Sequence, residues 1–368
     1  MKDVAQRIGQ LLIVGFDGTS MSTGLSSLLK RIQPAGVILF ARNIVSAGQT
    51  HQLLKDCQAC VQTPLFTCVD MEGGLVDRLK NAIGPAPSAA EVFATADRRL
   101  FRKHGRIIGE TCRATGFNTD LAPTVDLALE ESKSVMRSRT VSEDPKLTVR
   151  YAREFLAGLA TARVLGAAKH FPGLGGATLD THHELPAVKR SLRKLWEEDM
   201  YPYRAMRREL RMVLVGHANY PDVTKDHKPA SLSKKWLTDI LRKRVGYQGL
   251  ILSDDLEMGG VLKAAPIERA SVEHIRAGGD LCLLCHKEEG ILKSYQELVR
   301  ETESDGKFRT RVEDSLSRIA TFKRKSRELR RWNSSPTKER VEDLSRKLWE
   351  FGEQVRLHGL AKGATTND

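Results

Sequence analysis

Short apolar runs alternate along the chain with longer segments in which apolar residues recur at helical spacing. Unbroken apolar runs of this length are typical of parallel strands covered by helices, so the pattern indicates an α/β fold. Eight such runs within 368 residues favour a closed (β/α)8 TIM-type barrel over an open doubly wound sheet. The runs are Leu11–Phe16, Val37–Phe40, Pro64–Asp70, Phe117–Val125, Val164–His170, Met212–His217, Leu250–Asp254 and Asp280–Cys285.

The segments between the runs predict the covering helices. We expect helices at about residues 2–9, 20–32 and 47–61, and one long helix over residues 88–114. Beyond Cys285 the chain is highly charged and carries two further apolar stripes at helical spacing. The stripes are Val312, Leu316, Ile319 and Phe322, then Val341, Leu344, Leu348, Phe351 and Val355, with a break at Asn333–Pro336.

These patterns predict a single catalytic domain with a C-terminal helical extension. The barrel would occupy residues 1–290, amphipathic helices packed on it residues 291–361, and a disordered tail residues 362–368. For the last apolar stripe we favour core packing against the barrel, and binding of a partner protein is the alternative.

Polar residues stand at the carboxyl ends of most of the apolar runs. In a parallel barrel these ends converge on one face, where the active sites of such barrels are built. Capping and loop solvation explain a single polar end, but they give no preference for catalytic residue types. The sequence therefore predicts a pocket at this face. The residues are Arg42, Asp70, Asp126, His170, His217 and Asp254.

The fifth run leads into a glycine-rich segment, Lys169–Pro186. Glycine tolerates positive φ, so the segment is typical of a mobile active-site loop at a strand end. The spacing Asp180-x-His182 places a carboxylate next to an imidazole, which orients the ring and sets its pKa for proton transfer. We expect the chemistry of the protein to be centred on this segment.

Charge and hydropathy narrow the class of protein. The net charge of +13 at pH 7 would attract polyanions, but Lys and Arg are interleaved with Glu and Asp, as in residues 328–346. A solvated basic surface is therefore the interpretation we favour over dedicated nucleic-acid binding. No run is long enough to cross a bilayer, so we expect a cytoplasmic protein with no membrane partner.

Six cysteines are present, and four of them form the pairs Cys57-x-x-Cys60 and Cys282-x-x-Cys285. Pairs of this kind can bind zinc. However, the first pair falls on a helical pattern, the second lies in an apolar strand pattern, and the two are far apart in sequence. We therefore favour buried, reduced cysteines, and we expect neither a metal nor another cofactor.

Three stretches carry a family resemblance: Lys169–Pro186, Asp70–Arg78 and Ile251–Met258. Together they closely resemble the family three glycoside hydrolases, and within them the bacterial β-N-acetylhexosaminidases of the cytoplasmic, cell-wall-recycling type. The resemblance covers nearly the whole chain up to about Cys285. Similar spacing continues in Leu121–Leu127, in Arg139 with Glu143–Pro145, in His217–Pro221 and in Pro229–Ser233.

The resemblance implies a retaining double displacement, in which a carboxylate attacks the anomeric carbon and water releases the covalent glycosyl-enzyme. The family's nucleophile follows Ser or Thr at the end of the seventh strand, which is Asp254 here. Asp255 is its adjacent competitor. Because alternation along a strand aims only one of the two into the pocket, we prefer Asp254.

The resemblance also implies an Asp–His dyad on the fifth loop in place of a second carboxylic acid. His182 would protonate the leaving oxygen and later activate water, and Asp180 would orient its ring and raise its pKa. His183 is the rival, but the family spacing Asp-x-His selects His182.

Five further residues match those that hold the sugar in the family. Asp70, Arg78, Lys169 and His170 match residues at the sugar hydroxyls, and Arg139 matches one at the N-acetyl side. Two residues depart from the family pattern, and neither removes a proposed catalytic group. Leu75 stands where Arg is usual and would alter support beneath the sugar, and Leu174 stands where His is frequent.

The resulting expectation is a hydrolase that removes terminal β-linked N-acetylglucosamine from a small glycoside such as a peptidoglycan-derived muropeptide. Two alternatives keep the fold: a β-N-acetylglucosaminide phosphorylase, and a β-glucosidase or β-xylosidase. A third alternative is a catalytically silent sugar-binding or scaffold protein. The intact Asp180, His182 and Asp254 argue against it, because a binding module needs neither a nucleophile nor a proton shuttle.

Overall fold

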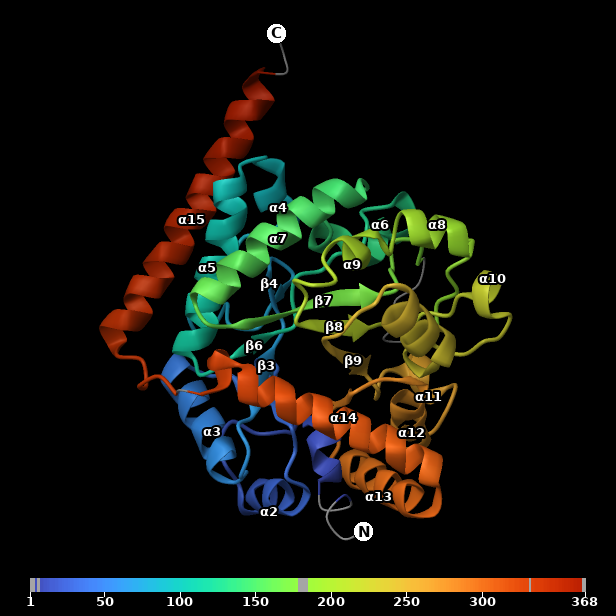
Figure 1. Ribbon diagram of the computed structural model, residues 1–368. Coiled ribbons are helices and arrows are strands. Elements are labelled where there is room, and N and C mark those ends of the chain that lie inside the picture. Colours follow the sequence, from blue (N-terminus) through green and yellow to red (C-terminus); the bar gives the residue numbers. More distant parts are fainter. Residues whose placement is uncertain (1–3, 5–6, 178–184, 331, 366–368) are drawn as a thin grey trace.

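Eight parallel strands close into a barrel in the described part of the chain. The computed structural model describes all residues except 1–3, 5–6, 178–184, 331 and 366–368 (Figure 1). Each barrel strand lies beside the next one in sequence, and β10 closes the barrel against β1. The predicted (β/α)8 fold is thus confirmed. The strands are β1 (Leu12–Val14), β2 (Gly36–Ile38), β3 (Phe66–Val69), β6 (Thr119–Asp120), β7 (Leu165–Phe171), β8 (Met212–Val215), β9 (Leu250–Asp255) and β10 (Leu281–Leu284).

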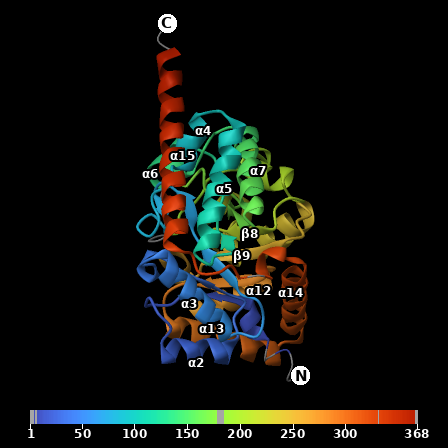
Figure 2. The same ribbon diagram turned by 90° about the vertical axis from the view of Figure 1, so that its left-hand side faces the viewer.

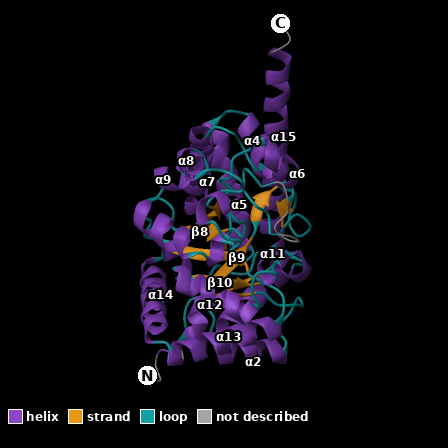
Figure 3. Ribbon diagram, turned by 90° about the vertical axis from the view of Figure 1, so that its right-hand side faces the viewer, coloured by secondary structure: helices purple, strands orange, loops and turns teal. Residues whose placement is uncertain are grey.

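Helices enclose the strands on the outside of the barrel, as Figure 3 shows. The α-helices are α2 (Thr23–Ile32), α3 (Ala47–Ala59), α4 (Ala89–Ala94), α5 (Arg98–Ala114), α6 (Lys133–Met136), α7 (Pro145–Thr161), α8 (Leu192–Glu197), α9 (Tyr201–Ala205), α10 (Pro221–Thr224), α11 (Gly259–Leu262), α12 (Ile267–Ala277), α13 (Glu288–Ser304), α14 (Gly306–Lys325) and α15 (Lys338–Thr365). Short 3₁₀-helices are η1 (Ile8–Leu11), η2 (Ala41–Asn43), η3 (Glu130–Ser132), η4 (Arg137–Arg139), η5 (Ala230–Leu232) and η7 (Arg327–Leu329), and η6 (Lys235–Arg244) is a π-helix.

The barrel strands are apolar because both of their faces are covered. Every residue of β1, β2, β3, β8 and β10 is buried. Each fully buried Leu, Ile or Val stabilises the fold by about 1.5–3 kcal/mol. A small antiparallel hairpin, β4 (Met71–Gly73) and β5 (Val76–Asp77), follows β3 at the carboxyl end of the barrel and bears Glu72.

The prediction of a single helix over residues 88–114 was wrong, because the structure has two helices there, α4 and α5. Ala96 has a φ of +54°, in the left-handed region that interrupts a helix. Asp97 then starts the second helix, because its side chain accepts a hydrogen bond from the Arg99 N–H. Of the helix expected at residues 2–9, residues 2–3 and 5–6 lie outside the described residues and Val4 is helical. The 3₁₀-helix η1 follows from Ile8, so β1 begins at Leu12.

The fourth apolar run, residues 117–125, pairs as a strand only at Thr119–Asp120. Pro123 lies in this run and has no N–H to donate to a neighbouring strand, which ends regular pairing early. An isolated bridge between Thr124 and Lys169 continues the contact with β7. The polar residues that follow are thereby still held at the carboxyl end of the barrel.

The two C-terminal apolar stripes form α14 and α15 as expected, and both pack on the protein's own core. Leu344, Leu348, Phe351 and Val355 of α15 are buried, whereas Trp349 on the same helix is 68% exposed. Figure 2 shows α15 beside α5 and α4 and projecting past them at its C-terminal end. The helix runs to Thr365, beyond residue 362 where we expected a tail to begin.

Candidate active site

A cavity of about 250 Å³ opens at the carboxyl ends of the barrel strands. Three carboxylates, one guanidinium and one imidazole face it from β9 and from the residues that follow β3, β5 and β10, among apolar neighbours. This is the position at which polar strand ends were expected to meet. The lining residues are Ile38, Phe40, Asp70, Arg78, Leu121, Asp254, Asp255, Met258, Leu283, Cys285 and His286.

Asp254 lies in this cavity as an anion with one oxygen available. Its Oδ1 accepts the Asp255 N–H at 2.9 Å, and its Oδ2 lies 3.9 Å from His170 Nε2. Burial raises the pKa of Asp254, but groups around it, the His170 ring first and the Asp255 N–H among them, lower it more, so the pKa lies below its usual value. A carboxylate in this state is ionised at neutral pH and able to act as a nucleophile.

Asp255 also lines the cavity, so the expectation that strand alternation would aim only one carboxylate inward was wrong. The reason is a register shift, since Leu281 pairs with Leu252 but Leu283 pairs with Asp255. The extra residue on β9 turns both carboxylates toward the cavity. They differ in their bonding: the Glu257 N–H binds Asp255 Oδ1 at 3.0 Å, and His286 Nε2 lies 3.0 Å from Asp255 Oδ2.

His217 fixes the backbone beneath these two carboxylates. Its Nε2 donates to the Asp255 carbonyl oxygen at 2.9 Å, and its Nδ1 accepts from the Ser231 hydroxyl at 2.7 Å. Burial lowers the pKa of His217, which keeps the ring neutral, in agreement with this hydrogen-bond pattern. The ring therefore positions the end of β9 through a neutral hydrogen-bond chain.

Four charged side chains form a buried network beside the cavity. Lys169 Nζ lies 2.7 Å from both Asp70 Oδ1 and Glu72 Oε1. Arg139 binds Glu72 through two hydrogen bonds, of 2.9 and 2.8 Å. Burial raises the pKa of Glu72, but Arg139 and Lys169 lower it far more, so this carboxyl group stays ionised. The two carboxylates balance the two cations, which makes burial of the network possible.

Asp126 connects the sugar-binding candidates to the loop. Its Oδ2 lies 2.7 Å from His170 Nδ1, which fixes the ring with Nε2 directed toward Arg139 Nη2 at 3.5 Å. Its Oδ1 accepts the Leu174 N–H at 2.7 Å. One buried carboxylate therefore holds both a site histidine and the first turn of the glycine-rich segment.

The predicted substrate-binding residues occupy two layers. Asp70 and Arg78 line the cavity itself, whereas Arg139, Lys169 and His170 lie around it in the network. The Arg78 guanidinium lies 5.7 Å from the Phe40 ring centroid. Within the described residues, nothing accepts a hydrogen bond from its buried Nε.

Asp180 and His182 lie outside the described residues, as does His183. Their assignment as a proton-transfer dyad stays a prediction. Sequence reasoning missed Glu72, although it lies in the Asp70–Arg78 stretch that carried the resemblance. Its partners, Arg139 and Lys169, are distant in sequence, and no periodic pattern relates the three residues.

Of the two family departures, Leu75 lies in the turn between β4 and β5 and is 54% exposed. The expected change in support beneath the sugar stays a prediction. Leu174 is buried in the apolar cluster around Phe171, so it contributes to packing at the base of the loop.

The cysteines are free thiols. Cys57, Cys282 and Cys285 are buried, and burial raises the pKa of each thiol above its usual value. Among the residues that the structure describes, no group of three or more His, Cys, Asp and Glu side chains is arranged to hold a metal ion.

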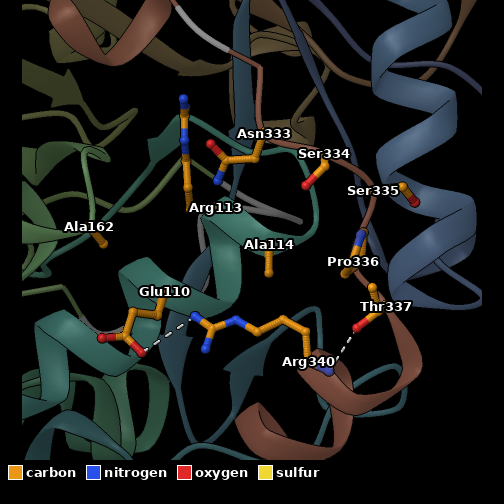
Figure 4. A pocket seen from close by; sticks show the side chains of 10 residues that line it. All are labelled: Glu110, Arg113, Ala114, Ala162, Asn333, Ser334, Ser335, Pro336, Thr337 and Arg340. Atoms are coloured by element: carbon orange, nitrogen blue, oxygen red, sulfur yellow. Dashed lines mark hydrogen bonds and ion pairs between the residues drawn. The ribbon is translucent and has the colours of Figure 1, made fainter.

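A larger cavity, of about 510 Å³, lies away from this site (Figure 4). It is formed by the carboxyl ends of α5 and α7 and by residues 333–337 before α15. Arg340 crosses it to Glu110, at 3.9 Å. Because α5 and α7 end where β6 and β7 begin, this cavity lies at the amino ends of the strands.

The barrel, with carboxylates gathered at the carboxyl ends of its strands, is typical of enzymes that cleave glycosides. Residues 3–322 match the glycosyl hydrolase family 3 N-terminal domain, and the chain belongs to this family. The family resemblance stated from the motifs is therefore confirmed. No helix in the described part of the chain is long and apolar enough to cross a membrane.

Relatives and solved structures agree with this membership. The chain is 32% identical to a β-hexosaminidase of Xanthomonas oryzae pv. oryzae over 285 residues, which are 76% of this chain and 84% of the relative. A β-hexosaminidase of Stenotrophomonas maltophilia is 30% identical over the same shares. The solved family 3 β-N-acetylglucosaminidase from a Paenibacillus species superposes with a TM-score of 0.85 at 29% identity, over 94% of this chain and 68% of that chain.

Proposed function

We propose that this family 3 glycoside hydrolase is a retaining β-N-acetylglucosaminidase. The proposal rests chiefly on Asp254, an ionised carboxylate with one oxygen available at the end of β9. The similarity to β-hexosaminidases and to the Paenibacillus enzyme supports an N-acetylhexosamine as the sugar.

In the first step, an Asp254 oxygen forms a bond to the anomeric carbon while the bond to the leaving oxygen breaks. The electron pair of the broken bond stays on the leaving oxygen, which takes a proton from the His182 imidazolium. In the second step, neutral His182 removes a proton from water, and the water oxygen displaces Asp254. Two inversions leave the configuration of the sugar unchanged.

The buried network would hold the sugar before this reaction. Asp70 accepts hydrogen bonds from hydroxyl groups, and Arg78 and Lys169 donate to them, all from fixed strand ends. Fixed donors and acceptors lower the entropy cost of reaching the reactive geometry. His170 would also bind a sugar hydroxyl, and its neighbour Arg139 stands where the N-acetyl side of the sugar would lie.

A panel of aryl β-glycosides, assayed with and without inorganic phosphate, tests the proposal. We expect the N-acetylglucosaminide to be hydrolysed fastest, to free N-acetylglucosamine that is first released as the β-anomer, at a rate independent of phosphate. An Asp254→Asn preparation controls for contaminating hydrolases.

Three other outcomes would each support one of the alternatives. A phosphate-dependent rate with a sugar 1-phosphate product would indicate a phosphorylase. Faster hydrolysis of the glucoside or the xyloside would indicate a β-glucosidase or a β-xylosidase. Binding without turnover would indicate a sugar-binding protein. The cytoplasmic location and the muropeptide-like substrate stay predictions, which cell fractionation and assays on peptidoglycan fragments test.

A further inference from the structure

A buried ion pair lies under the two described flanks of the segment that bears Asp180 and His182. Arg190 Nη2 lies 3.0 Å from Asp199 Oδ2, with both side chains almost fully buried. Arg190 also pairs with Glu198. No well-aligned hydrogen bond to either Asp199 oxygen occurs in the described part of the chain, so Arg190 is its main charge compensation.

The first flank, Phe171–Ala177, rests directly on Asp199. Gly173 has a φ of +132°, and a Cβ added there would lie 2.6 Å from Asp199 Cβ. No side chain separates the two backbones at this point, so a shift of Asp199 displaces Gly173. The Tyr220 hydroxyl donates a hydrogen bond to the Gly173 carbonyl oxygen at 2.7 Å.

The second flank, residues 185–190, meets the first at Arg190. A Cβ added at Gly176 would lie 2.8 Å from Arg190 Cδ and 3.1 Å from Val188 Cγ1. Backbone hydrogen bonds from Asn219 to Pro186 and from Val188 to Asn219, each 2.8 Å, fix this flank to the segment after β8. The ion pair is therefore the point at which both flanks come together.

The charge state of Asp199 is sensitive to its surroundings. Burial raises the pKa of Asp199 to about 7, while Arg190 opposes this rise and Asp126 and Glu198 add to it. The Tyr203 and Tyr220 hydroxyls also face it, and burial raises the pKa of each, so both stay neutral. Arg190 is therefore the cation that favours an ionised Asp199.

We propose that the Arg190–Asp199 ion pair is a positioning element for proton transfer, because it sets the flanks of the segment on which the acid/base dyad is placed. The inference rests on the proposed function for its kinetic consequence. Loss of the pair misplaces the acid but leaves Asp254 in its reactive state, because its neighbour Asp255 is held by His217 and its own carboxylate lies beside His170. The first chemical step then depends more steeply on the leaving group.

The test compares aryl β-N-acetylglucosaminides whose leaving groups span a wide pKa range, from 2,4-dinitrophenol to phenol. For Asp199→Asn we expect kcat/KM on the phenyl substrate to fall by about 30-fold, and on the dinitrophenyl substrate by less than about 3-fold. Glu154→Gln is the matched control, because Glu154 also pairs with two arginines, Arg98 and Arg102, but lies on α7. Its losses should be equal across the series.

Gly176→Ala keeps the inference testable if Asp199→Asn does not fold. The added methyl presses on Arg190 without changing any charge, and Gly176 does not have the positive φ that would strain an alanine. We expect the same steepened leaving-group dependence. Equal losses across the series in both variants would overturn the inference.

Amide hydrogen exchange separates this inference from the proposed function. Asp199→Asn should speed exchange at Leu174, Ala177 and Val188, whereas Glu154→Gln should not. If the wild type hydrolyses no aryl glycoside, the proposed function fails, and faster exchange at the flanks still supports the positioning role. Unchanged exchange at both flanks would overturn that role.

Discussion

In the described part of the chain, buried networks of carboxylates and cations lie at both ends of the barrel. At the carboxyl end, Asp70 and Glu72 are paired with Lys169 and Arg139. At the amino end, Asp280, just before β10, is fully buried among arginines. Its cationic partners are Arg242, Arg311 at 3.2 Å and Arg318 at 2.7 Å.

The two networks differ in whether their carboxylate oxygens are all hydrogen-bonded within the protein or also face a cavity. Asp280 also accepts the Ile251 N–H at 2.9 Å and the Ser315 hydroxyl at 3.0 Å, so its oxygens are fully used within the protein. Asp70, in contrast, forms part of a cavity wall beside Asp254. Burial and residue type are therefore alike in the two networks, and access to a cavity distinguishes the candidate site from structural support.

The largest effect is expected at the carboxyl end, for Asp254→Asn. An amide cannot form the glycosyl-enzyme, and the Asp255 oxygens are engaged by Glu257 and His286, so kcat/KM should fall by at least about 10³-fold. Initial rates on an aryl N-acetylglucosaminide measure this loss. Asp255→Asn should lose less, and a loss below tenfold for Asp254→Asn would contradict the assignment of the nucleophile.

Glu72→Gln should lower kcat/KM by about 10²-fold, because Lys169 and Arg139 lose the charge that aligns them. The loss should appear in both KM and kcat, since substrate placement affects ground and transition states. Steady-state kinetics check this result. If a folded Glu72→Gln protein has the kcat and KM of the wild type, the carboxyl-end network does not contribute to substrate binding.

Asp280→Asn should act on stability alone. Removal of its charge leaves three arginines uncompensated and should lower the free energy of unfolding by about 3–5 kcal/mol. Urea titration measures the loss, and kcat/KM of the folded protein at low temperature should stay within about threefold of wild type. A selective kinetic defect would mean that the two ends are coupled.

The smallest effect is a shared dependence on pH. The pKa of Glu72 lies far below its unfolded value of 4.5, so its contribution to stability is complete above pH 4.5 and is lost as pH falls further. Asp280 behaves likewise below its unfolded value of 3.8. Urea titrations between pH 7 and 3 should measure a shrinking difference in the free energy of unfolding between the wild type and Glu72→Gln. This difference should begin to shrink at a higher pH than the difference between the wild type and Asp280→Asn. A constant difference across this range would contradict the low pKa of Glu72.

The barrel was predictable because a strand that is buried on both faces has an unbroken apolar sequence, and such runs are visible in the chain. The same argument placed Asp70 and Asp254 at one end, since parallel strands share a direction. The helix break at Ala96 was not predictable, because alanine has no sequence signal for a positive φ. The bulge that turns Asp255 inward depends on pairing between β9 and β10, which no local pattern records.

The site was predictable only where its residues belong to motifs. Resemblance placed Asp70, Arg78 and Asp254 among the site residues, and all three line one cavity. Glu72 was missed because its role arises from Arg139, 67 residues away in sequence, and from Lys169. The role of the Arg190–Asp199 pair likewise follows only from the structure, in which Gly173 packs on Asp199 and Gly176 on Arg190.

The most direct test of the account traps the glycosyl-enzyme and locates it by mass spectrometry. With a 5-fluoro analogue of N-acetylglucosaminyl fluoride, hydrolysis of the glycosyl-enzyme is slowed more than its formation, so the glycosyl-enzyme accumulates. The account predicts one sugar adduct, on the peptide that contains Asp254 and on that residue. An adduct on another residue, or turnover of the analogue to a product of inverted configuration, would contradict it.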